Sequence, residues 1–349
     1  MNKLIIRKIL NKSLPALKKY SGSIARKSGE LLCKLSWFIC RIAAFTIGIW
    51  IVAAMPVVLR LPEYINIIFA AGLAILFLTG SRRRKGGTLI LLTVEAAFII
   101  HFAALTPEEQ FKDVKFRRVF AVKPAIRYLD KNKFEVINLR KNRYPADYDE
   151  NATYCDIFVN EFFDLTKVES MQFITVYWDG MWYAAHNMLN FKFSDGKELT
   201  VSVEPRTPVG VDRKPFTCLC KQQELLFILS DPEDLLDLRN RVRGEDMYIF
   251  ETSFTPLECR KILSGIISKA GKLHRDPEFY DLIKANCITA LLPYFRHARP
   301  ELQWDARCLF NGLIDRMLFD QNVLARRPGE SFESLKSRSF IKGKSQGKL

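Results

Sequence analysis

Long apolar stretches dominate the first hundred residues of the chain. Residues 35–59 and 61–80 are almost continuously apolar, and residues 88–105 form a third stretch that contains Glu95 and His101. A helix that crosses a bilayer needs about 20 mostly apolar residues. The pattern therefore predicts three transmembrane helices.

Two other interpretations of these stretches remain open at this level. A cleaved signal peptide would also explain the first stretch, but the basic region before it is long and two further apolar stretches follow. Buried core helices of a soluble protein are the second alternative. The length of the stretches and their charged flanks favour the membrane interpretation.

After residue 105 the apolar positions begin to alternate with polar ones, which is typical of β-strands. Residues 171–178 alternate and are rich in β-formers, and Asp179-Gly180 is a common hairpin turn. A second strand is predicted over 182–193, and the turn at 194–197 leads into a third over 198–206. These strands predict an antiparallel meander.

Shorter strands and helices complete the pattern. Further strands are predicted at 134–139, 224–229 and 247–254. Helices are predicted from Thr255-Pro256 to about Lys272, from Cys287 to Phe295, and over 304–324. An antiparallel sheet with helices packed on it makes the fold class α+β.

Charge fixes the predicted orientation in the membrane. The chain carries a net charge of +15, and residues 1–34 contain nine Lys or Arg against the single acid Glu30. A second basic loop, Arg82-Arg83-Arg84-Lys85, separates the second and third apolar stretches. Because Lys and Arg favour the cytoplasmic side, three crossings place both basic segments inside and the rest of the chain outside.

The predicted organisation is therefore a basic cytoplasmic arm (1–34), a membrane domain with three helices (35–105) and an extracytoplasmic domain (106–349). Nucleic acid is not expected as a partner, because the basic excess lies where membrane topology requires it and no aromatic-basic binding motif occurs.

An oxidising compartment outside the membrane would permit disulfides in the predicted outer domain. Six of the eight cysteines lie in the predicted outer domain: Cys155, Cys218, Cys220, Cys259, Cys287 and Cys308. An even number does not fix any pairing. No Cys or His spacing typical of a zinc site occurs, so neither a metal nor another cofactor is expected.

Cys287 is the candidate nucleophile. Asn286 is a good N-cap residue and an apolar run follows, so Cys287 is predicted to lie in the first turn of a helix. The positive end of the helix dipole is expected to lower the pKa of a thiol there. A thiolate and an imidazole are the groups that acyl transfer through a thioester requires.

His186 is the candidate imidazole. A two-residue turn after its strand would pair position 186 with 205, and a three-residue turn would pair it with 204 or 206. Glu204 and Arg206 therefore flank or face the imidazole, and a carboxylate there would orient it. Plainer interpretations remain: Cys287 as a small buried residue, His186 in a structural hydrogen bond, and Glu204 paired with Arg206.

At these residues the sequence resembles the Lnb-type periplasmic domain family. This family is associated with lipoprotein N-acylation and usually follows a short membrane-helix region. The resemblance covers about residues 130–345. The matching stretches are Val176-Tyr-Trp-Asp-Gly, Ala185-His186, Phe191-Lys-Phe-Ser-Asp-Gly-Lys, Val201-Ser-Val-Glu204-Pro-Arg206, Gln223-Glu224-Leu225, Gly244-Glu-Asp-Met-Tyr248, Phe279-Tyr280 and Asn286-Cys287-Ile-Thr289, with weaker matches at Asn311-Gly-Leu-Ile-Asp315-Arg316 and Phe332-Glu-Ser-Leu-Lys.

The resemblance implies a circularly permuted papain-like domain, akin to the NlpC and lecithin:retinol acyltransferase groups, in which His precedes Cys. It implies that Cys287 is the nucleophile, His186 the base and Glu204 the orienting carboxylate. The residues after Glu204 depart from the family pattern, in which Thr commonly stands between the Glu and the Arg; here Pro205 stands there.

The resemblance also implies a substrate site. Arg206 is expected to bind an acidic headgroup or to brace Glu204, and Tyr177 and Tyr248 are expected to contact substrate. The implied activity is a thiol acyltransferase in the bacterial inner membrane, with its C-terminal domain in the periplasm. It would move an acyl chain from a phospholipid to an amine, the N-terminus of a lipoprotein.

Two alternatives come from different classes of protein. A cysteine peptidase or amidase that acts on cell-wall peptides would need an open polar cleft, whereas acyl transfer favours an apolar groove at Cys287. A catalytically inactive, membrane-tethered module would have Cys287 buried or in a disulfide.

Overall fold

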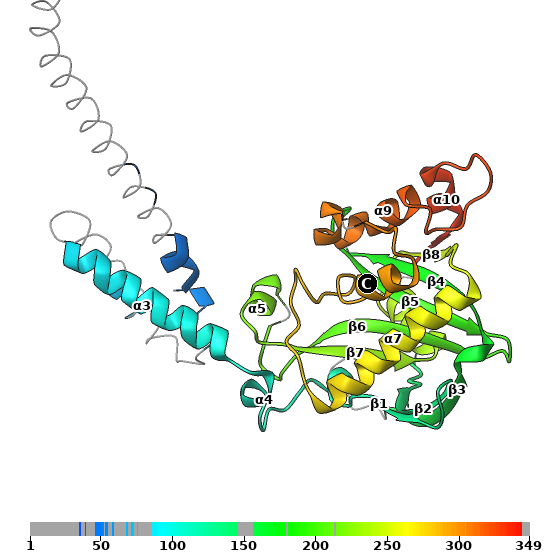
Figure 1. Ribbon diagram of the computed structural model, residues 1–349, viewed down its shortest axis with the longest axis horizontal. Helices are drawn as coiled ribbons and strands as arrows, with labels where there is room; N and C mark the ends of the chain where they lie inside the picture. Colours follow the sequence, from blue (N-terminus) through cyan, green and yellow to red (C-terminus); the bar gives the residue numbers. More distant parts are fainter. Residues whose placement is uncertain are drawn as a thin grey trace, which may run out of the picture. The chain divides into compact units, whose positions relative to one another are not determined.

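The fold was analysed in a computed structural model of the chain (Figure 1). The structure describes residues 85–343 except 146–155, 179–180, 213 and 304, together with scattered residues between 35 and 75. The chain divides into two compact units, Met1–Leu105 and Thr106–Leu349. The predicted basic arm and most of the first two apolar stretches lie outside the described residues.

Helix α3 (Lys85–Ala104) belongs to the first unit and contains most of the third predicted apolar stretch. Within the described part of the chain, no helix is both long and apolar enough to cross a membrane.

The second unit is built on a nine-stranded, mostly antiparallel sheet. The strand order is β1-β2-β7-β6-β5-β4-β8-β9, and β3 also pairs with β2. Among the strand pairs that the structure describes, only β2 and β7 run parallel. The strands are β1 (Ala125–Tyr128), β2 (Lys133–Arg140), β3 (Phe158–Asp164), β4 (Val168–Tyr177), β5 (Ala185–Phe193), β6 (Glu198–Arg206), β7 (Glu224–Ser230), β8 (Met247–Glu251) and β9 (Phe340–Ile341). The predicted α+β class is confirmed.

Short helices and one long helix surround the sheet. The α-helices are α4 (Pro107–Gln110), α5 (Pro215–Leu219), α6 (Pro232–Asp237), α7 (Pro256–Arg275), α8 (Leu292–Ala298), α9 (Ile314–Asp320) and α10 (Phe332–Arg338). The tighter or wider turns are η1 (Arg118–Phe120), η2 (Leu165–Lys167), η3 (Leu238–Val242), η4 (Ala306–Leu309) and η5 (Asn311–Leu313).

The long helix α7 begins where its sequence predicts. The Thr255 side chain accepts from the backbone N–H of Glu258, whose carboxylate accepts from the backbone N–H of Thr255. This reciprocal cap satisfies two N–H groups at the helix start. The apolar side of α7, which includes Ile262 and Ile266, is buried in the main core, and Figure 1 shows the helix crossing the sheet.

The two faces of the sheet carry separate cores. Leu189 of β5 packs in the core that contains α7 and Cys287, whereas Met188 packs in a second core behind the sheet. Because side chains alternate along a strand, Asn187 shares the face of Leu189, and His186 shares the face of Met188. The candidate base therefore projects from the face opposite the core that contains Cys287, and the Cys287 sulfur meets β5 at the backbone N–H of Asn187.

The predicted helix from Cys287 to Phe295 is wrong at its start. Residues 286–291 form turns, and α8 begins only at Leu292. Pro293 explains the difference, because proline is tolerated in the first turn of a helix and disrupts its interior.

The predicted helix over 304–324 is likewise broken into η4, η5 and α9. Gly312 lies at the break. A side chain there would clash with the backbone carbonyl of Trp182, so the chain passes close to the entry of β5.

Candidate active site

The turn that carries Cys287 is capped by Asn286. The Asn286 Oδ1 accepts from the backbone N–H groups of Ile288 at 2.9 Å and Thr289 at 2.8 Å. The Asn286 N–H in turn donates to Thr289 Oγ1 at 2.9 Å. Asn286 thus acts as the predicted cap, although it caps an isolated turn and not a helix. These bonds fix the backbone on both sides of the thiol.

The Cys287 thiol is enclosed by hydrogen-bond donors. It is 2% exposed and forms no disulfide. Asn311 donates from Nδ2 to the sulfur at 3.0 Å. Burial raises the pKa of the thiol to about 12, although a backbone hydrogen bond from Asn187 lowers it. The expected lowering of this pKa is therefore wrong, because removal of the thiolate from water outweighs the donors that face it.

The donor from Asn187 is explained by an opening between two strands. The ladder between β5 and β6 ends at the pair Met188 and Ser202, although β6 continues to pair with β7 as far as Arg206. Asn187 is the first residue of β5 beyond that last pair. At this opening the sulfur of Cys287 takes the place of a strand partner.

His186 lies at the same opening, in a buried polar network. Its Nε2 is 2.7 Å from Ser202 Oγ and 3.0 Å from Glu204 Oε1. Ser202 donates to Glu204 Oε1 at 3.0 Å. The other ring nitrogen, Nδ1, makes no hydrogen bond with any residue that the structure describes. The carboxylate thus holds one side of the imidazole and leaves the other side available.

Arg239 from η3 completes the network. It donates to Glu204 Oε1 at 3.2 Å and lies 3.2 Å from Glu245 Oε2. Burial lowers the pKa of His186, the negative charge of Glu204 raises it, and Arg239 lowers it again. The imidazole is therefore neutral near pH 7, as a general base must be.

The side chains of His186 and Cys287 meet β5 at neighbouring residues, His186 itself and Asn187, without a direct bond to each other. The imidazole projects from position 186, and the thiol accepts the N–H of position 187. Within the described residues, no hydrogen bond joins the two side chains. They share an electrostatic environment, because Glu204 raises and Arg239 lowers the pKa of both groups.

The lowered pKa of His186 predicts a pH dependence. If the neutral imidazole is the base, activity should persist as pH falls through 6.5, the ordinary value, and decline only below it. The free energy of unfolding depends on pH in the same direction. The unfolded chain binds this proton near pH 6.5 and the native chain does not, so stability present above 6.5 is lost as pH falls. Initial rates between about pH 5 and 9 would measure this, and a midpoint above 6.5 would contradict it.

Arg206 does not reach Glu204. Its three nitrogens donate to the carbonyls of Phe120 and Ala121 and to Glu224, all within 2.7 Å, and the guanidinium lies 3.6 Å above the ring centre of Phe116. Arg206 thus ties β6 to the end of η1 and to Ala121, away from the candidate base.

Tyr177 and Tyr248 lie together, as the strand pairing of β4 and β8 allows. Their rings meet edge to face with centres 5.5 Å apart. The hydroxyl of Tyr177 donates to Asp315 at 2.8 Å and accepts from Lys336 at 2.6 Å. Both tyrosines line a pocket of about 420 Å³ that also includes Trp182. Of the predicted substrate residues, these two share a pocket and Arg206 does not join them.

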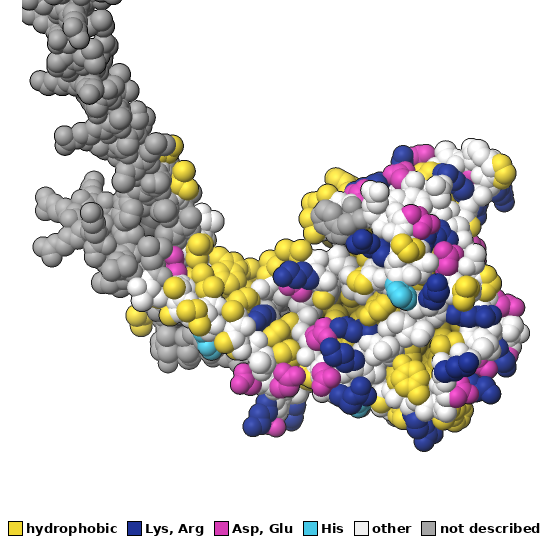
Figure 2. All heavy atoms as spheres, in the orientation of Figure 1, with side chains coloured by type: hydrophobic (Ala, Val, Ile, Leu, Met, Phe, Trp, Pro, Cys, Tyr) yellow, Lys and Arg dark blue, Asp and Glu magenta, His cyan; other side chains and the backbone are white. Residues whose placement is uncertain are grey.

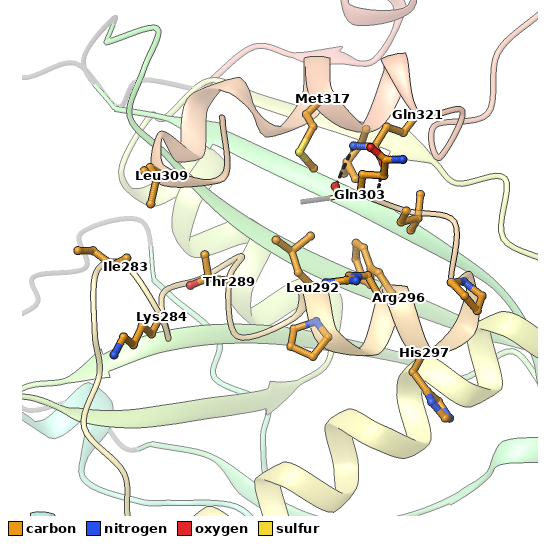
Figure 3. A pocket seen from close by; sticks show the side chains of 15 residues that line it. Ile283, Lys284, Thr289, Leu292, Arg296, His297, Gln303, Leu309, Met317 and Gln321 are labelled. Atoms are coloured by element: carbon orange, nitrogen blue, oxygen red, sulfur yellow. Dashed lines mark hydrogen bonds between the residues drawn. The ribbon is translucent and has the colours of Figure 1, made fainter. Parts of the chain in front are cut away.

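A larger, mainly apolar groove lies beside the turn that carries Cys287. Its volume is about 700 Å³. Figure 3 shows its lining side chains on both walls, with Thr289 and Leu292 facing Leu309 and Met317. Lys284 and Arg296 add positive charge to the lining. The groove could hold an extended apolar ligand with an anionic end.

Sequence reasoning missed several members of the site. Ser202 was detectable, because it precedes Glu204 by two residues and shares its face of the strand. Arg239 comes from a distant element and carries no local signal, whereas Asn311 begins one of the weaker stretches that match the family. Among the described residues, no group of three or more His, Cys, Asp or Glu side chains is arranged to hold a metal ion.

Comparison with known proteins assigns a family to this region. The family model for the Lnb N-terminal periplasmic domain matches residues 155–318. That span contains His186, Glu204, Cys287 and Asn311. No curated protein and no solved structure matches the chain. Residues 155–318 of this chain are therefore an Lnb N-terminal periplasmic domain.

Proposed function

We propose that this domain is a thiol acyltransferase that carries an acyl chain on Cys287 and passes it to an amine. The observation that carries the proposal is the apolar groove of about 700 Å³ beside the Cys287 turn, because an acyl chain needs an apolar binding site. A cysteine peptidase or amidase would instead need an open polar cleft there.

In the proposed reaction, the Cys287 thiol and the His186 imidazole are both neutral at the start. His186 takes the thiol proton as the Cys287 sulfur attacks the ester carbonyl of a phospholipid. A C–S bond forms, the ester C–O bond breaks, and His186 returns the proton to the departing lysolipid oxygen. Glu204 stabilises the imidazolium that forms in between, and the backbone N–H of Cys287 helps to hold the oxyanion.

Two features of the network support these roles. The Nε2 atom of His186 faces Glu204 at 3.0 Å, so its Nδ1 is the nitrogen left for the thiol. The sulfur accepts hydrogen bonds from Asn311 and from the backbone of Asn187, and both stabilise a thiolate. Catalysis requires a small displacement that exposes the sulfur, since it is 2% exposed at rest.

The arrangement also supports a circularly permuted papain-like fold. The strand that carries His186 precedes the turn that carries Cys287 in the chain. That turn packs with α7 in the main core, against a mostly antiparallel sheet. This order is what permutation of a papain-like domain would give.

The proposed location is the bacterial inner membrane, with several membrane spans and the C-terminal domain in the periplasm. The family is one of periplasmic domains, and the apolar stretches and basic segments before Thr106 support an anchored protein. The proposed partners are phospholipid as acyl donor and a lipoprotein N-terminus as acceptor. An anchor would keep the domain at both substrates.

A defined transfer assay tests this function. The purified full chain in phospholipid nanodiscs is incubated with a synthetic lipopeptide that carries a free N-terminal amine, and products are read by mass spectrometry. A lipopeptide heavier by one acyl chain is expected, with an equal amount of lysophospholipid. Lysophospholipid and free fatty acid without acylated peptide would identify a hydrolase instead.

The burial of Cys287 favours a second candidate, a catalytically inactive module tethered to the membrane. A nucleophile must meet its substrate, and this thiol is 2% exposed. Labelling with iodoacetamide separates the two. Modification of Cys287 that is faster in lipid than in detergent supports the enzyme, whereas a thiol unreactive in both supports the inactive module.

A further inference from the structure

We propose that Asn311 selects the acyl acceptor, and that it favours a nucleophile whose attacking atom carries two hydrogens, a primary amine. This inference rests on the proposed function, because it concerns the second half of that reaction. Asn311 lies at the start of η5, on a segment far from both Cys287 and His186 in the sequence.

Only one of the two polar atoms of the Asn311 carboxamide has a hydrogen-bond partner among the described residues. Its Nδ2 donates to the Cys287 sulfur at 3.0 Å. Its Oδ1 is buried and has no hydrogen-bond partner among the described residues. A buried acceptor without a partner is destabilising, so such an atom needs an explanation. Here the atom lies next to the candidate nucleophile.

Neighbouring contacts hold the main chain of Asn311 in place. The side chain of Asn187 donates to the main-chain carbonyl of Asn311 at 3.1 Å. The following residue, Gly312, has no room for a side chain against the backbone at Trp182, and its N–H donates to the Tyr183 carbonyl at 3.2 Å. These contacts fix the backbone of Asn311 beside the sulfur, and the bond from Nδ2 to the sulfur orients its side chain.

The geometry decides which group the free oxygen receives. In a planar carboxamide, Oδ1 and Nδ2 share one carbon, so a donor bound to Oδ1 lies beside the sulfur that Nδ2 contacts. An acyl group on that sulfur has its carbonyl carbon within reach of the same donor. The free oxygen is thus placed to hold the atom that attacks the thioester.

The second half-reaction accounts for both hydrogens of a primary amine. The nitrogen lone pair attacks the thioester carbon and a C–N bond forms. One hydrogen passes as a proton to His186, and the other is held by Asn311 Oδ1. The C–S bond then breaks, and the proton on His186 goes to the sulfur. An alcohol or a secondary amine has one hydrogen, which His186 must take, and Oδ1 stays unpaired.

Water also carries two hydrogens and would satisfy both groups. The difference between water and an amine therefore has to come from access, and the enclosed thiol is 2% exposed. The inference is therefore tested with acceptors of similar size that differ in the number of hydrogens on the attacking atom.

The experiment uses the purified full chain in nanodiscs, with an activated dodecanoyl ester as acyl donor. Equal concentrations of benzylamine and benzyl alcohol compete for the acyl group, and the amide-to-ester ratio is compared with that of a free thioester. Asn311→Ala is expected to lower the enzymatic ratio about tenfold, the worth of one hydrogen bond. Asn311→Asp, which keeps an acceptor oxygen, is expected to retain the wild-type ratio while forming the thioester more slowly.

A second arm needs no variant, so the inference remains testable if Asn311→Ala does not fold. For the wild-type chain, butylamine is expected to exceed pyrrolidine by about tenfold, after correction for their rates with a free thioester. An unchanged ratio in a folded Asn311→Ala chain, or equal corrected rates for the two amines, overturns the inference alone. Absence of any thioester on the wild-type chain overturns the proposed function and this inference with it.

Discussion

Replacement of Cys287 by alanine is expected to reduce acyl transfer by about a thousandfold or more, because the variant lacks the sulfur that carries the acyl chain in the proposed reaction. Cys287→Ser should be nearly as inactive, since its hydroxyl is harder to deprotonate than a thiol. The transfer assay with lipopeptide and nanodiscs measures both variants. The loss should appear in the rate constant for transfer and leave phospholipid binding in the groove intact.

Cys259 provides a matched control. It is a buried, free cysteine on α7, and burial raises the pKa of its thiol to about 12, as it does for Cys287. Cys259→Ala removes the same atom from the same core and touches nothing in the polar network. We expect similar losses of stability from the two alanine variants and a loss of activity only from Cys287→Ala. Equal activity of the two would show that Cys287 is a structural residue.

Removal of the Glu204 carboxylate is expected to cost about 3–5 kcal/mol of stability, because Arg239 is then left buried with a weaker partner. The side chains of Glu204 and Arg239 are each 5% exposed, so water cannot replace the lost charge. Glu204→Ala should therefore shift the urea midpoint strongly. Glu245→Ala is the control, since Glu245 also pairs with Arg239 but is more exposed, at 20%.

Glu204→Gln separates the catalytic role from the structural one. The amide keeps the shape and loses the charge that raises the pKa of His186. The pKa of the imidazole should fall further, so the acid limb of the activity profile should move to lower pH, and the maximum rate should also fall. A limb that stays in place while stability drops would mean that Glu204 does not act on a catalytic imidazole.

The pairing of His186 with Glu204 followed from local sequence because a hairpin register is a local property. Lys192 pairs with Glu198, and continuing that register places position 186 opposite 204, one of the partners expected for a short turn. The sequence did not reveal that the ladder opens after Met188. At that opening the N–H of Asn187 meets the sulfur of Cys287, a residue a hundred positions later in the chain.

Two errors came from local rules that a distant constraint overrides. The helix dipole suggested a lowered thiol pKa, but Pro293 delays the helix and burial dominates the thiol. Arg206 was expected near Glu204 because the two share a strand face, yet Arg206 forms its ion pair with Glu224 from the neighbouring strand. Asn311 was noted only as the start of a weak match and not as a site residue, since its place beside the sulfur depends on the packing of η5 against the entry of β5.

The most direct test of the central claim is to trap the acyl chain on the protein. The full chain is incubated with phospholipid of one defined acyl length and no amine, denatured in acid, digested and analysed by mass spectrometry. The peptide that contains Cys287 should gain the mass of that acyl group and lose it in neutral hydroxylamine, as a thioester does. An unmodified Cys287 peptide, with the lipid intact or with the acyl group on another residue, would contradict the account.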